Sequence, residues 1–561
     1  MALAGGKRWL RFAGASGALF GVFGCGDAQL TAILTDPAPA ASADQCAAGE
    51  GRGAGPLPPM GWNGWNTFGC GPDLDEAKFR ATADALVQSG LRAAGYEYVN
   101  LDDCWQAGRA ADGTIQVDPD RFPSGLAALG SYLHQNQLKF GIYSNVGDCV
   151  RPELTTPSSA GYESQDAASY ASFGADYVKY NACGGTRGEV QSSFEAMRDA
   201  LAQTGRPMLL SVVDAPFKPW HPEIGQLWRT HGEIEPTWEG IVATIDATTR
   251  LAAYAGQGGY NDSDMLWLGH EGLSETESRA YFSMWAALAS PLLAGNDLTV
   301  MPEAVRVILT QPDLIAFNQD PLRLQAALVG TQGDVSVYAK PLAECGARAV
   351  VLLNRGDTSA MGSVTWAELG LNAGEAWVRN VWEGTKTLAA DGLKPLLGPH
   401  EAVALRVVGS ELPLPRGEVQ LSDLTWTYAT NGWGPVERDQ EPGGTAEGDG
   451  GMLALDGREY AKGLGMNSPA LVRYRLGKRC RELNADIGID DATGDAGSVI
   501  FQVWADGDKL FDSGVVLGKD PARHITVDVT GRSELRLFVG EVEDFGQDHA
   551  AWADARLSCE D

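Results

Sequence analysis

Between residues 60 and 295 the sequence repeats one pattern, a short apolar run that ends abruptly in polar residues. One run ends in the adjacent carboxylates Asp102 and Asp103, and another ends in Lys179 and Asn181. Parallel β/α barrels carry their active sites at this end of their strands. The pattern therefore favours a barrel with a polar pocket at one end.

The spacing of these runs predicts strands that alternate with helical stretches, such as 76–90 and 276–289, and a last helix at 303–316. Such alternation indicates a parallel sheet, and eight repeats indicate a closed (β/α)8 barrel rather than an open sheet. The predicted strands are 60–65, 96–103, 138–144, 175–181, 206–213, 227–234, 264–269 and 290–295. We expect the barrel to occupy residues 56–320 and to close near Asn318.

The helical pattern stops after Pro321, and the rest of the chain is rich in β signals. Residues 321–410 contain short Val-, Leu- and Ala-rich segments between turns, which predict an antiparallel β-sandwich. The segments are 334–341, 347–354, 375–383 and 401–408. A Pro-rich linker at 411–418 leads to a second β-sandwich at 419–561, with predicted strands at 498–505, 524–529 and 534–540.

The N-terminus has the layout of an export signal at residues 1–25. Three basic residues precede an apolar stretch from Phe12 to Phe23, which Gly24 and Cys25 follow. Two interpretations stay open: a lipoprotein signal, with Cys25 lipidated as a membrane tether, or a plain signal peptide cleaved elsewhere. Residues 26–55 are rich in Ala, Pro, Gly and Asp, which predicts a disordered tether. We expect an exported protein, secreted or lipid-anchored at a bacterial cell envelope.

The net charge of −30 and the pI of about 4.6 argue against nucleic-acid binding, because phosphate backbones repel such a chain. Nine cysteines in an exported chain should mostly pair, and a bridge between Cys480 and Cys559 is plausible. The sequence has no CxxC pair, no metal cluster and no nucleotide-binding loop, so we expect no metal and no cofactor. The partners of Cys46 and Cys345 stay open.

The predicted strand ends carry acids, bases and aromatic residues together. Buried charges need partners, and Lys179 and Arg229 stand against several carboxylates, so such a cluster can neutralise itself and also bind sugar hydroxyls. The polar and aromatic residues at the predicted strand ends are Trp62, Trp65, Asp102, Asp103, Tyr143, Asn145, Lys179, Asn181, Asp214, Trp228, Arg229, Glu233, Asn261, Asp262 and Asp264.

Longer motifs around these residues resemble glycoside hydrolase family 27, the α-galactosidase and α-N-acetylgalactosaminidase family. The motifs are PPMGWNGWNTF at 58–68, GYEYVNLDDCW at 95–105, FGIYSNVG at 140–147, DYVKYNACG at 176–184, GGYNDSDMLWLG at 258–269 and NQDPL at 318–322. The resemblance covers about 58–408. It implies a galactose subsite in which Asp102 and Asp103 take the 4- and 6-hydroxyls, lined by Trp65, Asp102, Asp103, Tyr143, Lys179, Arg229 and Asp264. Asp214 is a further candidate binding residue, because it stands at the end of the fifth predicted strand. It also implies two disulfides, Cys70–Cys104 and Cys149–Cys183.

The chain departs from the family at the positions that carry the chemistry. Asn181 stands where the family has its nucleophilic Asp, and Glu233 stands where it has its acid/base Asp. Ser144-Asn145, Val213-Asp214-Ala215 and Ser263 replace other family residues. An amide is a poor nucleophile, whereas retaining glycosidases use two carboxyl groups.

The sequence predicts an α-galactosidase-type glycosidase that acts on terminal α-linked galactosides, with a galactoside-binding, lectin-like pseudoenzyme as the alternative. An active enzyme could be a weak retaining one, or an inverting one in which Asp214 or Asp264 activates water and Glu233 is the acid. The substituent at carbon 2 of the sugar stays open: Ala215 leaves room for an acetamido group, and Phe217 argues against it.

Motifs in the last β unit resemble the NPCBM carbohydrate-binding module family. They are LSDLTWTYATNGWGPVERD at 421–439, YAKGLGMNSPA at 460–470, VIFQVWADGDKLFDSGV at 499–515 and DHAAWADARLSC at 548–559. Asn467 stands where this family has a sugar-binding His. Four tryptophans, Trp426, Trp433, Trp504 and Trp552, could stack on sugars, and we expect Trp426 and Trp504 to belong to the core.

Overall fold

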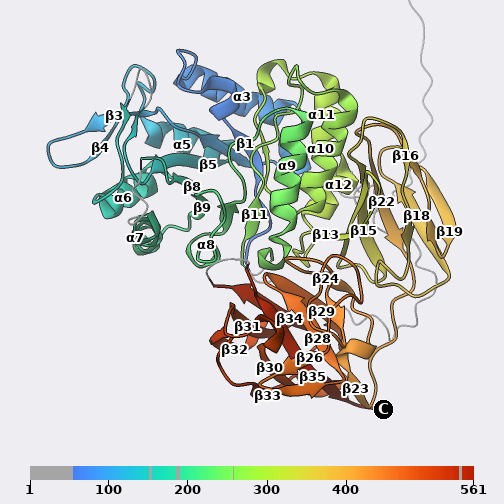
Figure 1. Cartoon of the computed structure of the whole chain (residues 1–561). Helices are drawn as coiled ribbons and strands as arrows, with labels where there is room; N and C mark the ends of the chain where they lie inside the picture. Colours follow the sequence, from blue (N-terminus) through green and yellow to red (C-terminus); the bar gives the residue numbers. More distant parts are fainter. Residues whose placement is uncertain (1–54, 151–154, 185–189, 257, 543–545) are drawn as a thin grey trace, which may run out of the picture. The chain divides into compact units, whose positions relative to one another are not determined.

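The computed structural model describes residues 55–150, 155–184, 190–256, 258–542 and 546–561 (Figure 1). The expected signal segment, Cys25, Cys46 and all but the last residue of the expected tether lie outside the described residues. The described residues belong to one compact unit. None of their helices is long and apolar enough to cross a membrane.

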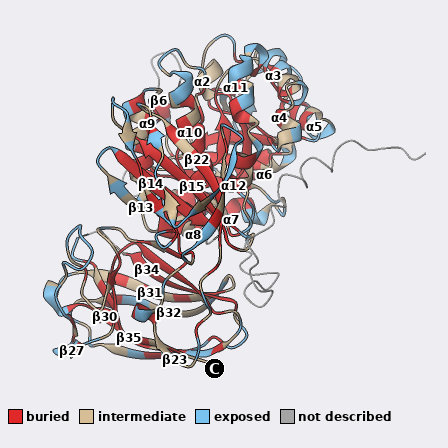
Figure 2. Ribbon diagram, turned by 90° about the vertical axis from the view of Figure 1, so that its right-hand side faces the viewer, coloured by how far each residue is buried: buried red, intermediate tan, exposed pale blue. Residues whose placement is uncertain are grey.

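The predicted (β/α)8 barrel is confirmed. Its eight strands are all parallel and follow the order β11-β10-β9-β8-β5-β2-β1-β12, and a parallel bridge between Leu266 and Ala294 joins the two ends of this series. Most strand residues are buried, because helices cover the outer face and side chains fill the interior (Figure 2). The strands are β1 (Met60–Asn63), β2 (Tyr98–Leu101), β5 (Lys139–Asn145), β8 (Tyr177–Asn181), β9 (Leu209–Val213), β10 (Leu227–Arg229), β11 (Tyr260–Asp262) and β12 (Leu292–Ala294).

The seventh strand lies earlier than the sequence predicted. It spans Tyr260–Asp262, whereas the prediction was 264–269. Asp264 has a positive φ of 73°, which interrupts an extended strand, and the bridge at Leu266 resumes the pairing beyond it. The apolar run after Asp264 therefore lies mostly beyond the end of the strand, at the rim of the barrel.

Some of the helices between the strands begin at a side chain that caps them. Asp75 accepts a hydrogen bond from the Lys78 amide, and Ser274 forms a capping box with Glu277. The helices are α2 (Trp65–Phe68), α3 (Glu76–Gln88), α4 (Leu91–Ala94), α5 (Leu126–Gln135), α6 (Glu163–Phe173), α7 (Val190–Gln203), α8 (His221–Ile224), α9 (Trp238–Thr249), η2 (Ala252–Tyr254), α10 (Glu275–Ala287), η3 (Leu298–Val300), α11 (Glu303–Leu309) and α12 (Pro312–Asn318). Two hairpins extend the loops of the barrel. They are β3 (Gln106–Arg109) with β4 (Ile115–Val117), and β6 (Cys149–Val150) with β7 (Thr155–Thr156).

The last predicted helix, 303–316, is two helices in the structure. Pro312 lacks a backbone N–H and begins α12, so the first helix ends at Leu309. The barrel ends at Asn318, whose side chain donates to the Ser290 carbonyl at 2.8 Å.

The next unit is an antiparallel sandwich with strand order β13-β14-β15-β22-β18-β19. Every residue of β15 is buried, because one face packs toward the barrel's α10 and the other toward the sandwich core around Trp366. The strands are β13 (Ala327–Gln332), β14 (Val335–Pro341), β15 (Ala347–Asn354), β16 (Ala360–Met361), β17 (Val364–Thr365), β18 (Glu375–Asn380), β19 (Lys386–Ala390), β20 (Gly392–Leu393), β21 (Leu396–Leu397) and β22 (Ala402–Val408).

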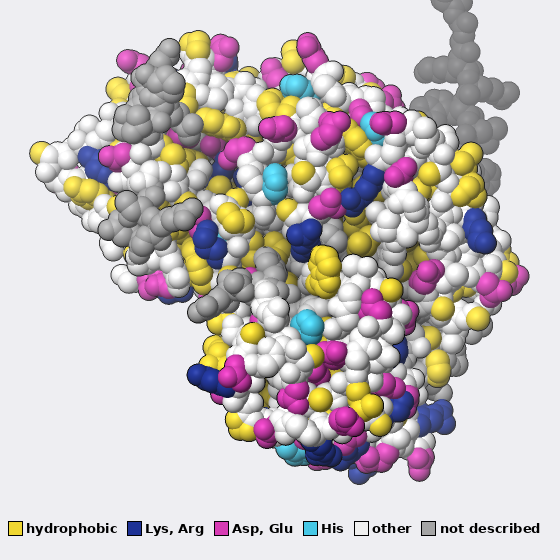
Figure 3. All heavy atoms as spheres, in the orientation of Figure 1, with side chains coloured by type: hydrophobic (Ala, Val, Ile, Leu, Met, Phe, Trp, Pro, Cys, Tyr) yellow, Lys and Arg dark blue, Asp and Glu magenta, His cyan; other side chains and the backbone are white. Residues whose placement is uncertain are grey.

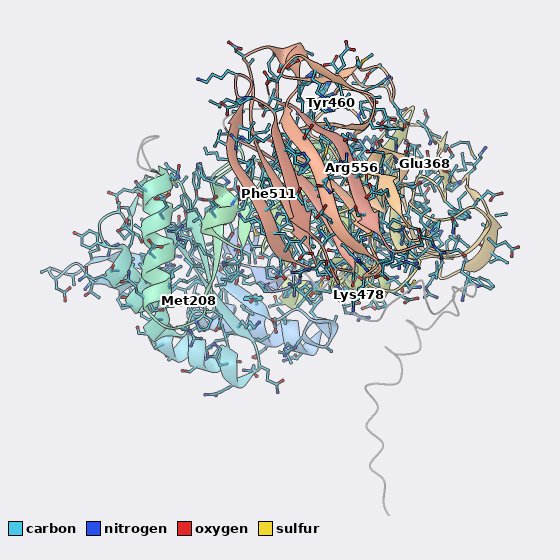
Figure 4. The ribbon with its side chains drawn as sticks, turned by 90° about the horizontal axis from the view of Figure 1, so that it is seen from below. Met208, Glu368, Tyr460, Lys478, Phe511 and Arg556 are labelled. Atoms are coloured by element: carbon cyan, nitrogen blue, oxygen red, sulfur yellow. A yellow bond between two sulfur atoms is a disulfide. The ribbon has the colours of Figure 1, made fainter. Side chains whose placement is uncertain are left out.

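The C-terminal module has two main antiparallel sheets, β25-β28-β35-β30-β33 with β23 on β35, and β24-β29-β34-β31-β32. The strands are β23 (Glu418–Gln420), β24 (Tyr428–Thr430), β25 (Glu437–Arg438), β26 (Leu453–Leu455), β27 (Arg458–Tyr460), β28 (Gly463–Asn467), β29 (Ala470–Arg475), β30 (Cys480–Ile489), β31 (Ser498–Ala505), β32 (Asp508–Leu517), β33 (Arg523–Asp528), β34 (Glu534–Glu541) and β35 (His549–Cys559), with η4 (Leu421–Asp423) and η5 (Asp491–Thr493) between them. Figure 4 labels Phe511 and Arg556, one from each sheet. A Cys480–Cys559 disulfide joins β30 to β35.

The four tryptophans of the module are buried to different degrees. Trp552 is fully buried, so it belongs to the core. Trp426 and Trp504 are half-buried and pack against the edges of hydrophobic cores, which agrees in part with the expectation. The Arg438 guanidinium lies 3.7 Å from the Trp426 ring centroid. Trp433 is 59% exposed, which leaves it the most accessible of the four for stacking on a sugar.

Candidate active site

The strand registers bring most of the predicted site residues to one end of the barrel. Tyr143 pairs with Lys179, Asn181 pairs with Val213, and Arg229 pairs with Asp262. Neighbouring parallel strands thus end side by side, and Asp102 and Asp103 follow β2 directly. The polar cluster is therefore built from regular strand ends.

Asp102 and Lys179 form a buried ion pair at the centre of this cluster. The Lys179 Nζ donates to Asp102 Oδ2 at 2.8 Å, and the Asn63 side-chain amide donates to the same oxygen at 2.8 Å. Burial alone would raise the pKa of the Asp102 carboxyl, but Lys179 together with the Asp103 amide and Asn63 holds it below its ordinary value. Both side chains therefore stay charged in a site with almost no solvent exposure.

Asp103 is held beside this pair by the backbone. The Asp103 amide donates to Asp102 Oδ1 at 2.9 Å, and the Cys104 amide donates to Asp103 Oδ1 at 2.7 Å. Cys104 has a positive φ of 74°, which turns the chain sharply after the two acids. The Cys70–Cys104 disulfide joins this turn to the segment after α2. The turn thus keeps adjacent carboxylates at one rim.

Tyr143 lies next to Lys179 on the neighbouring strand. Its ring centroid lies 5.7 Å from Lys179 Nζ, and its carbonyl accepts a hydrogen bond from the Trp105 indole at 3.0 Å. The second expected disulfide, Cys149–Cys183, is present, and Cys149 Sγ lies 3.7 Å from the Tyr143 hydroxyl.

Arg229 and Asp264 form the second buried ion pair. Arg229 Nη1 lies 2.8 Å from Asp264 Oδ2, which also accepts from the Ile234 amide at 2.9 Å, and the Met265 amide donates to Asp264 Oδ1 at 2.7 Å. Burial alone would lower the pKa of Arg229, but Asp264 and Asp262 raise it above its ordinary value. Both oxygens of Asp264 are thus occupied by protein donors.

Asn181 is the last residue of β8 and is half-buried. Its side-chain oxygen accepts a hydrogen bond from the Cys183 amide at 3.0 Å. The next amide, of Ala182, donates to the Val213 carbonyl at 2.9 Å, so the backbone here continues the sheet pairing. The amide that replaces the expected nucleophile is therefore fixed in place.

Glu233 lies at the open side of the site. Its side chain is 60% exposed, and Oε1 lies 3.7 Å from Arg229 Nη1. A cavity of about 420 Å³ opens here, and its walls include Trp65, Glu233, Ile234 and Trp267. Burial alone would lower the pKa of Lys179, but Asp102, Glu233 and Asp264 raise it above its ordinary value. Glu233 therefore acts electrostatically on the same cluster.

Asp214 differs from the other predicted residues, because its partners come from its own loop. Lys218 Nζ donates to Asp214 Oδ2, and His221 Nε2 lies 3.4 Å from the same oxygen. Burial alone would raise the pKa of Asp214, but His221 and Lys218 lower it. Asp214 therefore stands at a strand end, as predicted, within a separate polar group.

Two residues of the site were missing from the predicted set. The Asn63 side chain donates a hydrogen bond to Asp102, and Trp267 lines the same cavity as Trp65. Both lie inside the motifs at 58–68 and 258–269, so a reading of those motifs position by position could have found them. Among the described residues, no group of three or more His, Cys, Asp or Glu side chains is placed to hold a metal.

Comparisons with known proteins agree with this architecture. Residues 57–320 match the family described as "Alpha galactosidase A", residues 332–407 match its "C-terminal beta sandwich domain", and residues 417–558 match the NPCBM/NEW2 domain. The "Alpha-galactosidase A" of Cellvibrio japonicus is 42% identical over 376 residues, which cover 62% of this chain and 91% of that protein. The α-galactosidase of Cyamopsis tetragonoloba is 39% identical over 355 residues, covering 62% of this chain and 85% of that one.

Solved structures show the same relationship. The crystal structure of α-galactosidase I from Mortierella vinacea superposes with a TM-score of 0.59 and 31% identity, covering 63% of this chain and 97% of that chain. The uncovered part of this chain includes the C-terminal module, which matches its own domain family. The barrel, the sandwich and the relatives together place this chain in the α-galactosidase family of glycoside hydrolases, with an added carbohydrate-binding domain.

Proposed function

We propose that this chain binds terminal α-linked galactosides at the barrel mouth and hydrolyses them with a slowed chemical step. The observation that best supports this proposal is the buried Asp102–Lys179 ion pair, which lies beside Asp103 at neighbouring strand ends. Its charged atoms are desolvated and fixed, so they can bond sugar hydroxyls without reorganising. The second pair, Arg229–Asp264, gives the pocket the same character on its other side.

Glu233 is the proposed general acid. Its carboxyl is exposed at the cavity that would receive the leaving group, and it is the carboxyl of this cluster with the greatest exposure. A positioned acid contributes roughly 10²–10⁴-fold to such reactions. Asn181, on the opposite side of the proposed reaction, offers no charge to balance an oxocarbenium-like transition state.

The inverting alternative is disfavoured by the environment of its two candidate bases. Asp264 accepts from the Ile234 and Met265 amides and forms an ion pair with Arg229. Asp214 accepts from Lys218 and lies against His221. Asp264 therefore keeps no oxygen without a protein partner. At Asp214 burial alone would raise the pKa, but His221 and Lys218 lower it below its ordinary value, which makes this carboxylate a weaker base toward water. We therefore expect residual hydrolysis limited by the missing nucleophile rather than an efficient inverting reaction.

The amide side chain at position 181, which is a poor nucleophile, also favours a second candidate function. This candidate is a galactoside-binding protein without turnover. Calorimetric titration with galactose and hydrolysis of 4-nitrophenyl α-galactoside, with and without azide, separate the two. Galactose binding with azide-stimulated hydrolysis supports the proposed enzyme, and galactose binding without any hydrolysis supports the second candidate. Absence of galactose binding would refute both. Parallel titration with N-acetylgalactosamine tests the substituent at carbon 2.

A matched pair of lysine variants controls for fold. Lys179→Met removes the cation of the proposed subsite, whereas Lys139→Met removes a lysine at the start of β5, at the other end of the barrel, where it pairs with Glu97. Only the first should abolish galactose binding. Equal loss in both variants would mean that the effect is structural.

A further inference from the structure

A chain of contacts runs from the C-terminal module to the loop that carries Asp214. We propose that Tyr254 is a positioning residue through which the module fixes the barrel loop 214–221, and with it the part of the sugar site that Asp214 borders. This inference rests on the proposed galactoside site and assigns the module a role there, in addition to any sugar binding of its own.

The loop end of this chain of contacts is a fixed polar triad. The Lys218 amide donates to His221 Nδ1 at 3.3 Å, so the neutral ring carries its proton on Nε2, which faces Asp214 Oδ2 at 3.4 Å. His221 is fully buried, and burial lowers its pKa even though Asp214 opposes the shift. The position of the His221 ring therefore sets the position of the Asp214 carboxylate.

Aromatic packing continues from His221 to Tyr254. The Phe217 ring lies 5.5 Å from the His221 ring and 4.8 Å from the Tyr254 ring, measured between centroids. Tyr254 is buried and belongs to η2, far from the loop in sequence. Packed aromatic rings of this kind hold each other at defined angles, so movement of Tyr254 would release Phe217.

The module supplies the far side of Tyr254. The Phe538 ring of β34 packs edge-on against Tyr254 at 5.6 Å, and the Glu541 amide donates to the Tyr254 hydroxyl at 3.1 Å. One tyrosine thus contacts the module through its ring and its hydroxyl, and contacts the loop through the same ring. The barrel alone would leave this buried face of Tyr254 uncovered.

A second tyrosine provides a matched control. The Tyr428 hydroxyl of β24 donates to the Gln325 carbonyl at 3.0 Å, so it also joins the module to the preceding chain. The ring contacts that link Phe538 to His221 do not include Tyr428 or Gln325. Loss of the Tyr428 hydroxyl should weaken the interface without releasing the loop.

The first experiment is hydrogen–deuterium exchange on the full chain. In Tyr254→Ala and Phe538→Ala, the Lys218 and His221 amides should exchange at least about tenfold faster than in the parent, because their partners lose fixed positions. Tyr254→Phe keeps the ring and should restore most of the protection. Tyr428→Phe should leave exchange in 214–221 unchanged. Unchanged protection in both alanine variants, or equal loss in Tyr428→Phe, would overturn the proposal.

The second experiment measures the sugar site in an Asn181→Asp background. Tyr254→Ala and Phe538→Ala should raise KM for 4-nitrophenyl α-galactoside about three- to tenfold while kcat changes less than twofold. Asp214 follows Val213, the register partner of Asn181, so in the proposed site it would border the sugar rather than the scissile bond. Phe538→Leu replaces Phe538→Ala if the latter folds poorly. Failure of the parent to bind galactose would contradict the proposed function, whereas the exchange result would still decide the positioning role.

Discussion

The two sides of the barrel mouth differ in how their polar residues are held. On the binding side, Asp102–Lys179 and Arg229–Asp264 are buried ion pairs with further backbone partners. On the reaction side, Asn181 is half-buried and Glu233 is mostly exposed. The two departures from the family that would bear on catalysis, Asn181 and Glu233, fall on the proposed reaction side. We therefore expect recognition of the sugar and its cleavage to be separable properties of this chain.

This difference follows from the cost of burying charge. Removing one partner of a buried pair leaves an unpaired ion, which costs about 3–5 kcal/mol. Substituting a half-exposed carboxylate by an amide leaves no stranded charge. The reaction side can therefore change in sequence without loss of fold, whereas the binding side cannot.

The largest effect that would test this comparison is expected from Asn181→Asp. A carboxylate at this position supplies the missing nucleophile, so kcat for 4-nitrophenyl α-galactoside should rise by at least about 10³-fold while galactose affinity changes little. Steady-state kinetics and calorimetry measure the two quantities. Asn181→Ala is the control and should stay inactive unless azide is added. An unchanged kcat in Asn181→Asp would mean that the chemistry is located elsewhere.

Glu233→Gln, made in the Asn181→Asp background, should give the next largest change. Loss of the proposed acid should lower kcat by about 10²–10⁴-fold for galactosides with poor leaving groups. The melting temperature should hardly move, because the side chain is mostly exposed. Kinetics with two leaving groups of different basicity would reveal the expected selectivity, and an equal loss for both would argue against an acid role.

Lys179→Met tests the binding side of the barrel mouth. It should weaken galactose binding by about 10²-fold, through loss of a charge-assisted hydrogen bond and displacement of Asp102, and destabilise the fold by about 3–5 kcal/mol. Titration calorimetry and urea unfolding give both values. Lys139→Met, whose partner Glu97 is partly exposed, should lose less than about 1 kcal/mol and keep its galactose affinity.

The smallest expected effect is a dependence of stability on pH. The folded pKa of Asp102 lies below its ordinary 3.8, so the folded state binds fewer protons than the unfolded state in that range. Its stabilising contribution is complete above about pH 4 and is lost as the pH falls through the folded pKa. The difference in unfolding free energy between the parent and Asp102→Asn should therefore be constant above about pH 4 and shrink below it. A difference that shrinks toward neutral pH would contradict this assignment.

The sequence predicted the barrel because each strand combines an apolar run with a polar end, a signal that needs no knowledge of distant contacts. The seventh strand was misplaced because the φ of Asp264 cannot be read from an apolar run. The split of the last helix at Pro312 could have been predicted, because proline has no backbone N–H to donate to a helical hydrogen bond.

The sequence predicted which polar residues stand at the strand ends, but not which residues they contact. Strand ends identified Asp102, Lys179 and Arg229, whereas the assignment of Asp214 to a triad with His221 depends on the fold of one loop. Tyr254 carried no local signal at all. Its contacts with Phe217 and Phe538 join segments that lie far apart in the sequence, and such contacts appear only in three dimensions.

The hydrogen bond from the Ala182 amide to the Val213 carbonyl has a chemical consequence for Asn181. Spontaneous deamidation begins when the backbone nitrogen after an asparagine attacks its side-chain carbonyl carbon and closes a succinimide ring. Here that nitrogen is engaged in sheet pairing, so ring closure requires local opening of the barrel. Stored protein should therefore keep its amide, and any hydrolysis it shows can be attributed to the amide form rather than to an ageing by-product.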